Sequence, residues 1–154
     1  MAVKANFTSS DVKKQMTTFF EAVERKQIER LQYLGEMCVK HARLIPKEIG
    51  FEDQTGNLRS SIGYMVFKEG EAIHSSYQTV GKGAEGASKG AELAKRIGSK
   101  HSKSIMLVVT AGMEYAIHVE SKGRDVLTSA EHLAQQELPK IIERLVSNIQ
   151  RAAE

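Results

Sequence analysis

The first part of the chain has the hydrophobic pattern of one long helix. Apolar side chains recur at steps of three and four residues from Val12 to Ile45, which keeps them on one face of a helix with 3.6 residues per turn. The pattern predicts a helix from about residue 10 to about residue 44, ending before Pro46 and preceded by an N-terminal arm over residues 1–9. Globular helices usually run roughly 8–20 residues, so this one either spans its domain or projects to meet a neighbour.

The pattern then changes from helical to alternating. Residues 46–57 are rich in turn-forming side chains, which favours a connecting loop. Ile62–Phe67 reads as a strand with two apolar faces, and a hairpin turn at Glu69–Glu71 leads into a more polar strand over residues 72–80. Ile105–Thr110 has the most apolar strand pattern and is expected to be buried.

A second helical pattern begins near Asp125 and keeps apolar residues on one face from Leu127 to Ile149. Pro139 falls inside it and removes one backbone hydrogen bond, so we expect a kink or a break there. The order of elements predicts an α+β fold. In it, a small antiparallel β-sheet is packed by a long N-terminal helix and a C-terminal helix, as a single domain over residues 1–154.

The segment 81–103 interrupts this plan with a change of composition. Its six basic side chains outnumber its two acidic ones, and it is rich in glycine. The basic residues are Lys82, Lys89, Lys95, Arg96, Lys100 and Lys103. We expect a flexible basic Gly-rich insertion, with a short helix at most over Ala91–Ile97, that contributes little to the apolar core. Nucleic-acid phosphates need only positive charge and reach, so both a non-specific nucleic-acid contact and a solvated loop remain open.

Candidate catalytic and cofactor chemistry is sparse. Gly81–Gly86 spells G-x-G-x-x-G, but the preceding strand is polar and no acid follows at the spacing of dinucleotide sites, so we read a flexible loop. His118 and Glu120 would share a face of a strand, as a general-base pair would, yet no nucleophile or third partner accompanies them. The histidines and the cysteine lack metal-ligand spacing. We therefore predict no catalytic, cofactor or metal site from these residues.

Composition adds modest limits. Net charge is +3 and the isoelectric point about 9.0, which is mildly basic. The one cysteine, Cys38, lies on the apolar face of the first helix and fits core packing. Apolar runs fall short of the ~20 residues of a membrane span, and Met1–Phe7 lacks a signal-peptide core. These features favour a soluble protein that is made in a cytoplasm and has no membrane contact.

Two short segments stand out where the pattern changes. They read Thr55-Gly56-Asn57-Leu58-Arg59-Ser60-Ser61-Ile62 and Tyr115-Ala116-Ile117-His118-Val119-Glu120-Ser121-Lys122-Gly123. Together with Val126–Ala130 they resemble the head–tail joining, or tail-completion, family of tailed-phage neck proteins. That family shows T-G-N-L-R-x-S-I after a long N-terminal helix, Y-A-x-x-V-E-x-G later, and then a C-terminal helix that opens with an apolar residue and an alanine.

The resemblance implies a non-enzymatic structural protein of the virion. Such proteins are made in the host cytoplasm and sit in the neck, between the capsid portal or connector and the tail tube. It also implies a homo-oligomeric ring, commonly sixfold, whose partners are other neck, portal-side and tail-tube proteins. A basic insertion facing the lumen would suit passing DNA. Two alternatives stay open from the residues alone: a small adaptor that binds nucleic acid non-specifically through residues 81–103, and an enzyme that uses His118 and Glu120.

In this reading the first segment has structural roles. Gly56 permits a turn without a Cβ clash. Asn57 caps or braces that turn, and Leu58 and Ile62 are buried. Arg59 is either an interface anchor or a surface charge.

The second segment is expected to support the last helix. Tyr115 and Val119 pack beneath it, and Glu120 holds a turn amide or an arginine of a neighbour. Rings form from head-to-tail contacts that close on themselves. Apolar residues beyond the main stripe of the first helix, Phe19 and Ile28, supply one candidate contact face, and the edges of the sheet supply another.

Overall fold

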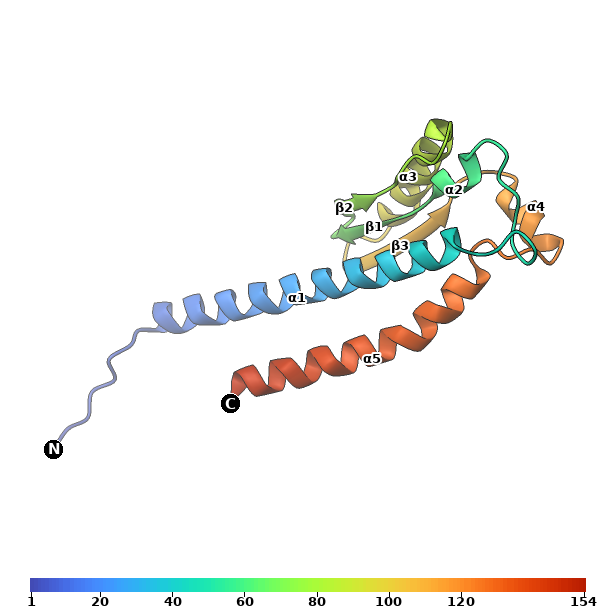
Figure 1. Ribbon diagram of the computed structural model, residues 1–154. Coiled ribbons are helices and arrows are strands. Elements are labelled where there is room, and N and C mark those ends of the chain that lie inside the picture. Colours follow the sequence, from blue (N-terminus) through green and yellow to red (C-terminus); the bar gives the residue numbers. More distant parts are fainter.

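The computed structural model covers residues 1–154 and has eight helices and strands. In chain order they are α1 (Ser9–Arg43), α2 (Asn57–Ser61), β1 (Ile62–Lys68), β2 (Glu71–Ser76), α3 (Ala84–Gly98), β3 (Ile105–Ala111), α4 (Ala116–Ser121) and α5 (Thr128–Ala153). The three strands form one antiparallel sheet, and long helices stand at both ends of the chain (Figure 1). The predicted α+β fold class is confirmed.

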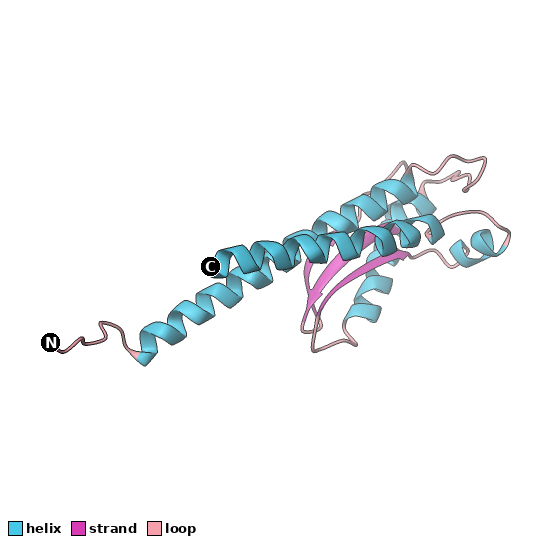
Figure 2. Cartoon of the chain, turned by 90° about the horizontal axis from the view of Figure 1, so that it is seen from below, coloured by secondary structure: helices cyan, strands magenta, loops and turns pink.

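Helix α1 is one uninterrupted helix of 35 residues. At ~1.5 Å per residue it is about 52 Å long. Thr8 and Asp11 start it with a capping box, in which the Thr8 hydroxyl accepts from the Asp11 amide and the Asp11 carboxylate accepts from the Thr8 amide. Its buried residues all lie in the C-terminal part, between Leu34 and Ala42, and its N-terminal half projects away from the sheet (Figure 2).

Strand β1 is the centre of the sheet, whose strand order is β2-β1-β3. Tyr64 of β1 pairs with Ser76 on one side and with Val109 on the other. All of β1 except Lys68 is buried, whereas β3 is an edge strand of mostly half-buried residues. The expected burial of Ile105–Thr110 is realised only in part: Val108 and Thr110 are buried, whereas the other residues are half-buried because β3 lies at the edge of the sheet.

The two faces of β1 contribute to two separate apolar cores. Ile62, Tyr64 and Val66 face α1 and α5 in the larger core. Met65 and Phe67 face α3 and pack with Ala94 and Val108 in the smaller one. The period of two along a strand assigns alternate residues to opposite faces. The domain therefore has three layers: α1 with α5, the sheet, and α3.

The segment 81–103 is a packed helix and not the flexible insertion that its glycines suggested. Helix α3 occupies Ala84–Gly98, and Ala94 is 0% exposed in the smaller core. Gly86, Gly90 and Gly98 are buried as well, because each stands where the helix approaches another part of the chain closely. Glycine here removes side-chain bulk at a contact, which composition alone does not distinguish from flexibility.

Helix α5 runs past Pro139 without a break and curves along its length (Figure 1). A proline inside a helix removes one hydrogen bond, but the helix continues through it, so the expected break does not occur. The second predicted strand ends at Ser76, earlier than the expected residue 80.

Deletion of residues 82–103 should abolish cooperative unfolding in urea, because it uncovers Met65 and Phe67 on the second face of the sheet. The milder change Phe67→Ala should lower the free energy of unfolding by about 3–5 kcal/mol. The control is Lys95→Ala, an exposed change on α3 that should leave stability within about 0.5 kcal/mol. A deletion variant that still unfolds cooperatively would show that α3 is dispensable.

Candidate functional site

The first motif segment forms the turn into α2, the helix itself and the first residue of β1. Gly56 has a φ of 83°, and a Cβ there would stand 2.0 Å from the Val80 carbonyl oxygen. The Asp53 carboxylate accepts from the Gly56 amide at 3.0 Å and the Arg59 amide at 2.8 Å, which satisfies free amides at the start of α2. Leu58 and Ile62 are buried. The predicted roles of Gly56, Leu58 and Ile62 are confirmed.

Asn57 braces α3 and not its own turn. Its side-chain oxygen accepts from the Gly86 amide at 3.2 Å, in the first turn of α3. A Cβ on Gly86 would stand 1.9 Å from the Asn57 carbonyl oxygen, and one on Gly83 would stand 2.2 Å from that of Gly56. The G-x-G-x-x-G pattern over residues 81–86 therefore places the backbones of α2 and α3 in contact.

Two arginines connect the end of α1 to this junction. Arg59 donates to the Arg43 carbonyl oxygen at 3.1 Å, and its guanidinium lies 5.4 Å from the centre of the Phe51 ring. Arg43 donates to the Ile62 carbonyl oxygen at 2.7 Å and to that of Gln78 at 3.0 Å. Burial lowers the pKa of Arg43 from its ordinary value. Arg59 satisfies a carbonyl at the C-terminus of α1, so its contacts lie within the chain.

The second motif segment forms α4 and positions α5. Oε1 of Glu120 accepts from the Leu127 amide at 2.7 Å and from the amide and hydroxyl of Thr128 at 3.1 Å each. The residue before α5 has no capping side chain of its own, so Glu120 supplies the negative charge that a helix N-terminus favours. Val119 packs against the larger core. The prediction that Glu120 would accept a hydrogen bond from a turn amide is confirmed.

Tyr115 and His118 differ from expectation. Tyr115 is 40% exposed and does not lie in the core beneath the last helix. His118 lies with Glu120 on α4, not on a strand, and residues two apart on a helix do not face each other. His118 is exposed while Glu120 is bound to the start of α5, so the two side chains do not form a general-base pair.

A polar cluster ties α1 to the free edge of the sheet. The Tyr64 hydroxyl donates to the Glu36 carboxylate at 2.9 Å and lies 3.0 Å from Nε2 of His74, and Ser76 donates to the same carboxylate at 3.3 Å. Burial and the Glu36 carboxylate raise the pKa of Tyr64 above its ordinary value. The cluster links three elements, α1, β1 and β2.

The six basic residues of the segment 81–103 are spread over α3 and its flanking turns. Lys89 forms an ion pair with Glu85 at 3.0 Å, and this carboxylate raises the pKa of Lys89. Lys89 and Arg96 also line a shallow depression together with Glu92 and Glu114. Acidic groups therefore alternate with the basic ones, which differs from a continuous positive stripe that would follow a phosphate backbone.

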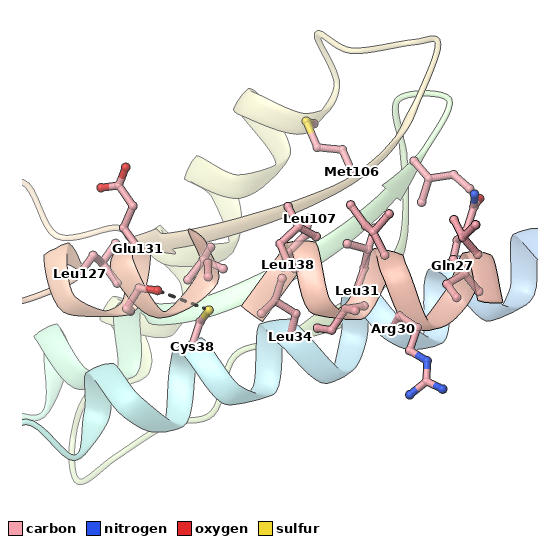
Figure 3. Close-up of a pocket in the computed structure, with 18 of the residues that line it drawn as sticks. Gln27, Arg30, Leu31, Leu34, Cys38, Met106, Leu107, Leu127, Glu131 and Leu138 are labelled. Atoms are coloured by element: carbon pink, nitrogen blue, oxygen red, sulfur yellow. Dashed lines mark hydrogen bonds between the residues drawn. The ribbon is translucent and has the colours of Figure 1, made fainter. Parts of the chain in front are cut away.

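An apolar groove lies between α1, β3 and α5 (Figure 3). Its volume is about 920 Å³, and 16 of its 19 lining residues are hydrophobic. Leu34 and Cys38 of α1, Leu107 of β3 and Leu138 of α5 all line it. Burial raises the pKa of the Cys38 thiol, which is packed in the core as the sequence predicted.

The N-terminal half of α1 carries a second apolar surface. Val12, Met16, Phe19 and Phe20 are exposed, and the two phenylalanine rings pack edge to face with centres 6.0 Å apart. These residues continue the stripe that lines the groove farther along α1. Phe19 is exposed as a contact face should be, whereas Ile28 packs against the larger core.

No group of three or more His, Cys, Asp or Glu side chains is placed to hold a metal ion. No helix has both the length and the apolar character needed to cross a membrane. Comparisons with protein-family models, with curated proteins and with solved structures find no match.

Gly86→Ala should destabilise the protein, although helix propensity alone favours alanine by about 1 kcal/mol. The new methyl group would clash with the Asn57 carbonyl, and overpacking of this kind costs about 1–3 kcal/mol or more. Ser88→Ala, on the exposed side of the same helix, is the matched control. Urea denaturation measures both, and a stabilised Gly86→Ala variant would contradict the close contact of α2 with α3.

Glu120→Ala should lower the free energy of unfolding by about 1–3 kcal/mol, because the amides at the start of α5 lose a charged acceptor. His118→Ala, an exposed change on the same short helix, should leave stability within about 0.5 kcal/mol. Thermal denaturation of both variants checks the difference. Equal stability of the two variants would exclude a capping role for Glu120.

Proposed function

We propose that this chain is a structural component of a tailed-phage virion. It would act as a head–tail joining or tail-completion protein that assembles as a ring between the portal or connector and the tail tube. The observation that carries the proposal is the apolar surface that one copy leaves uncovered, on the N-terminal half of α1 and along the groove beside α5. Large exposed apolar surfaces of this kind mark sites of association.

The two motif segments support the proposal in a specific way. Their residues are engaged within the chain: Gly56 and Asn57 at the contact of α2 with α3, Arg59 at the end of α1, and Glu120 at the start of α5. A protein that must present a long helix to its neighbours needs a rigid base for it. We infer that these segments build that base and that the helices make the contacts.

Assembly of such a protein needs contacts between different surfaces of identical copies, which close into a ring or extend into a filament. The helix surface around Phe20 and the groove beside α5 are two different apolar surfaces of one chain. The sixfold symmetry in the proposal comes from the family resemblance. The proposed partners are other copies of the chain and the portal-side and tail-tube proteins of the neck.

The alternative function, a small adaptor that binds nucleic acid through residues 81–103, has less support. Glu85, Glu92 and Glu114 lie among the basic residues around α3, and Lys89 is already paired. Binding of DNA by a monomer, weakening steeply as salt rises, would favour this adaptor over the neck protein. In the neck proposal the same basic residues contact passing DNA through charge alone.

Light scattering at several protein concentrations, with electron microscopy of any large species, tests the proposal. We expect discrete closed rings, formed by the chain alone or on added portal-side or tail-tube proteins. The portal-side and tail-tube proteins are also measured without this chain, as a control for rings that they form by themselves. A strict monomer at every concentration, with and without those partners, would overturn the proposed function.

A further inference from the structure

We infer that the groove between α1 and α5 receives the N-terminal half of α1 from a second copy of this chain. The docking segment runs from Val12 to Val23. This inference rests on the proposed function where it concerns a ring, and it names the two surfaces that would join neighbouring copies.

The groove is shaped to hold an apolar helix. Helices α1 and α5 run in opposite directions and form its two walls, and β3 closes it at one side (Figures 1 and 3). Ile142 and Val146 of α5 line it and are also exposed, as is Leu138 at the edge. Apolar walls with exposed upper edges match the recognition mode in which an amphipathic helix lies in a hydrophobic groove.

The docking segment has the matching pattern. Val12, Met16, Phe20 and Val23 recur at steps of four, four and three residues and so lie on one face of α1. The capping box at Thr8 holds this segment in a helix before any partner arrives. Because the helix is already formed, docking avoids the loss of backbone entropy that an unfolded peptide would incur.

The segment cannot fill the groove of its own chain. Leu31 and Leu34, which line the groove, belong to the same uninterrupted helix as the segment itself. About 12 Å of helix separate Val23 from Leu31. The segment therefore continues along the axis of α1, away from the groove, and cannot fold back into it. The occupant must come from another molecule, and a second copy carries the fitting helix.

Length agrees with a second copy as the occupant. The α5 wall, from Leu127 to Ile149, extends over ~33 Å, and the docking segment, residues 12–23 of α1, extends over ~17 Å. Half the side surface of a helix about 11 Å wide and 17 Å long is roughly 300 Å², or roughly 600 Å² for both partners. That falls below the ~1,200–2,000 Å² of stable interfaces.

A single docking contact is therefore weak. A copy in a closed ring both donates its helix and receives one, so two contacts must break before it can leave the assembly. Donor and receptor are different surfaces, so the contact propagates from head to tail and is stabilised when it closes. Isolated pairs should dissociate readily, whereas closed assemblies should persist.

Two charge substitutions test the docking directly. Phe20→Glu removes the donor and leaves the groove intact, and Ile142→Glu does the reverse. Both side chains are exposed, at 60% and 50%, so both variants should keep the wild-type melting temperature.

Each alone should be monomeric under conditions where the wild type assembles. An equimolar mixture should form no species larger than a readily dissociating heterodimer, because one intact donor meets one intact groove. Thr18→Glu, on the opposite face of α1, is the matched control and should assemble normally.

Native mass spectrometry measures the assembly of these variants. In a second experiment, a photo-crosslinking residue replaces Phe20 in the full chain, which is irradiated at its highest soluble concentration. Mixed with isotopically labelled copies, it should crosslink between chains to residues 138–146 of α5. Crosslinks confined to the N-terminal half of α1 of the other copy, outside the groove, or none between chains, would overturn the inference. Assembly of either variant alone to the same extent as the wild type would also overturn it.

The outcomes also separate this inference from the proposed function. Rings that form equally well with Phe20→Glu would exclude the docking surface and leave a neck protein that uses other contacts. Interchain crosslinks to α5 without any ring, even with portal-side and tail-tube proteins present, would support the docking and remove the neck function.

Discussion

The direct contact between the backbones of α2 and α3 is the constraint on which the rest of the structure depends. Gly56, Gly83 and Gly86 leave no room for side chains there, and the Asn57 side chain ties the two helices together. This contact sets the position of α3 over the second face of β1. With α3 in place, the central strand is covered on both sides and can be apolar on both faces.

The covered sheet is a rigid base from which the two long helices extend. Several polar side chains at the base bind backbone groups of the same chain, among them Arg43, Arg59 and Glu120. Such contacts position helix ends. What the base presents to other molecules is a surface: an exposed helical stripe and a groove of matching apolar character. The proposed role in assembly follows from that uncovered surface and from the helix that carries it.

The long N-terminal helix, the α+β class and the burial of Leu58 and Ile62 could be predicted, because each depends on local periodicity or on a short turn signal. The helix α3 could not, since its glycines have the same composition as a flexible loop and only their neighbours explain them. The strand placement of His118 and Glu120 failed for a related reason. A six-residue helix is too short to show a period, and the bond from Glu120 to α5 spans seven residues of irregular chain. The apolar stripe from Val12 to Phe20 was visible in the sequence, but the sequence did not show that the rest of the chain leaves this stripe exposed.

The sequence by itself determined where the two long helices and the three strands begin and end to within a few residues, and which side of each long helix is apolar. Both follow from interactions between residues that are close along the chain. The tertiary structure alone decided which apolar sides meet. The stripe of α1 is uniform along the sequence, yet its C-terminal part is buried against β1 and its N-terminal part is bare. The reason is geometric: a helix of this length extends beyond a three-stranded sheet, so its N-terminal part has nothing in its own chain to pack against.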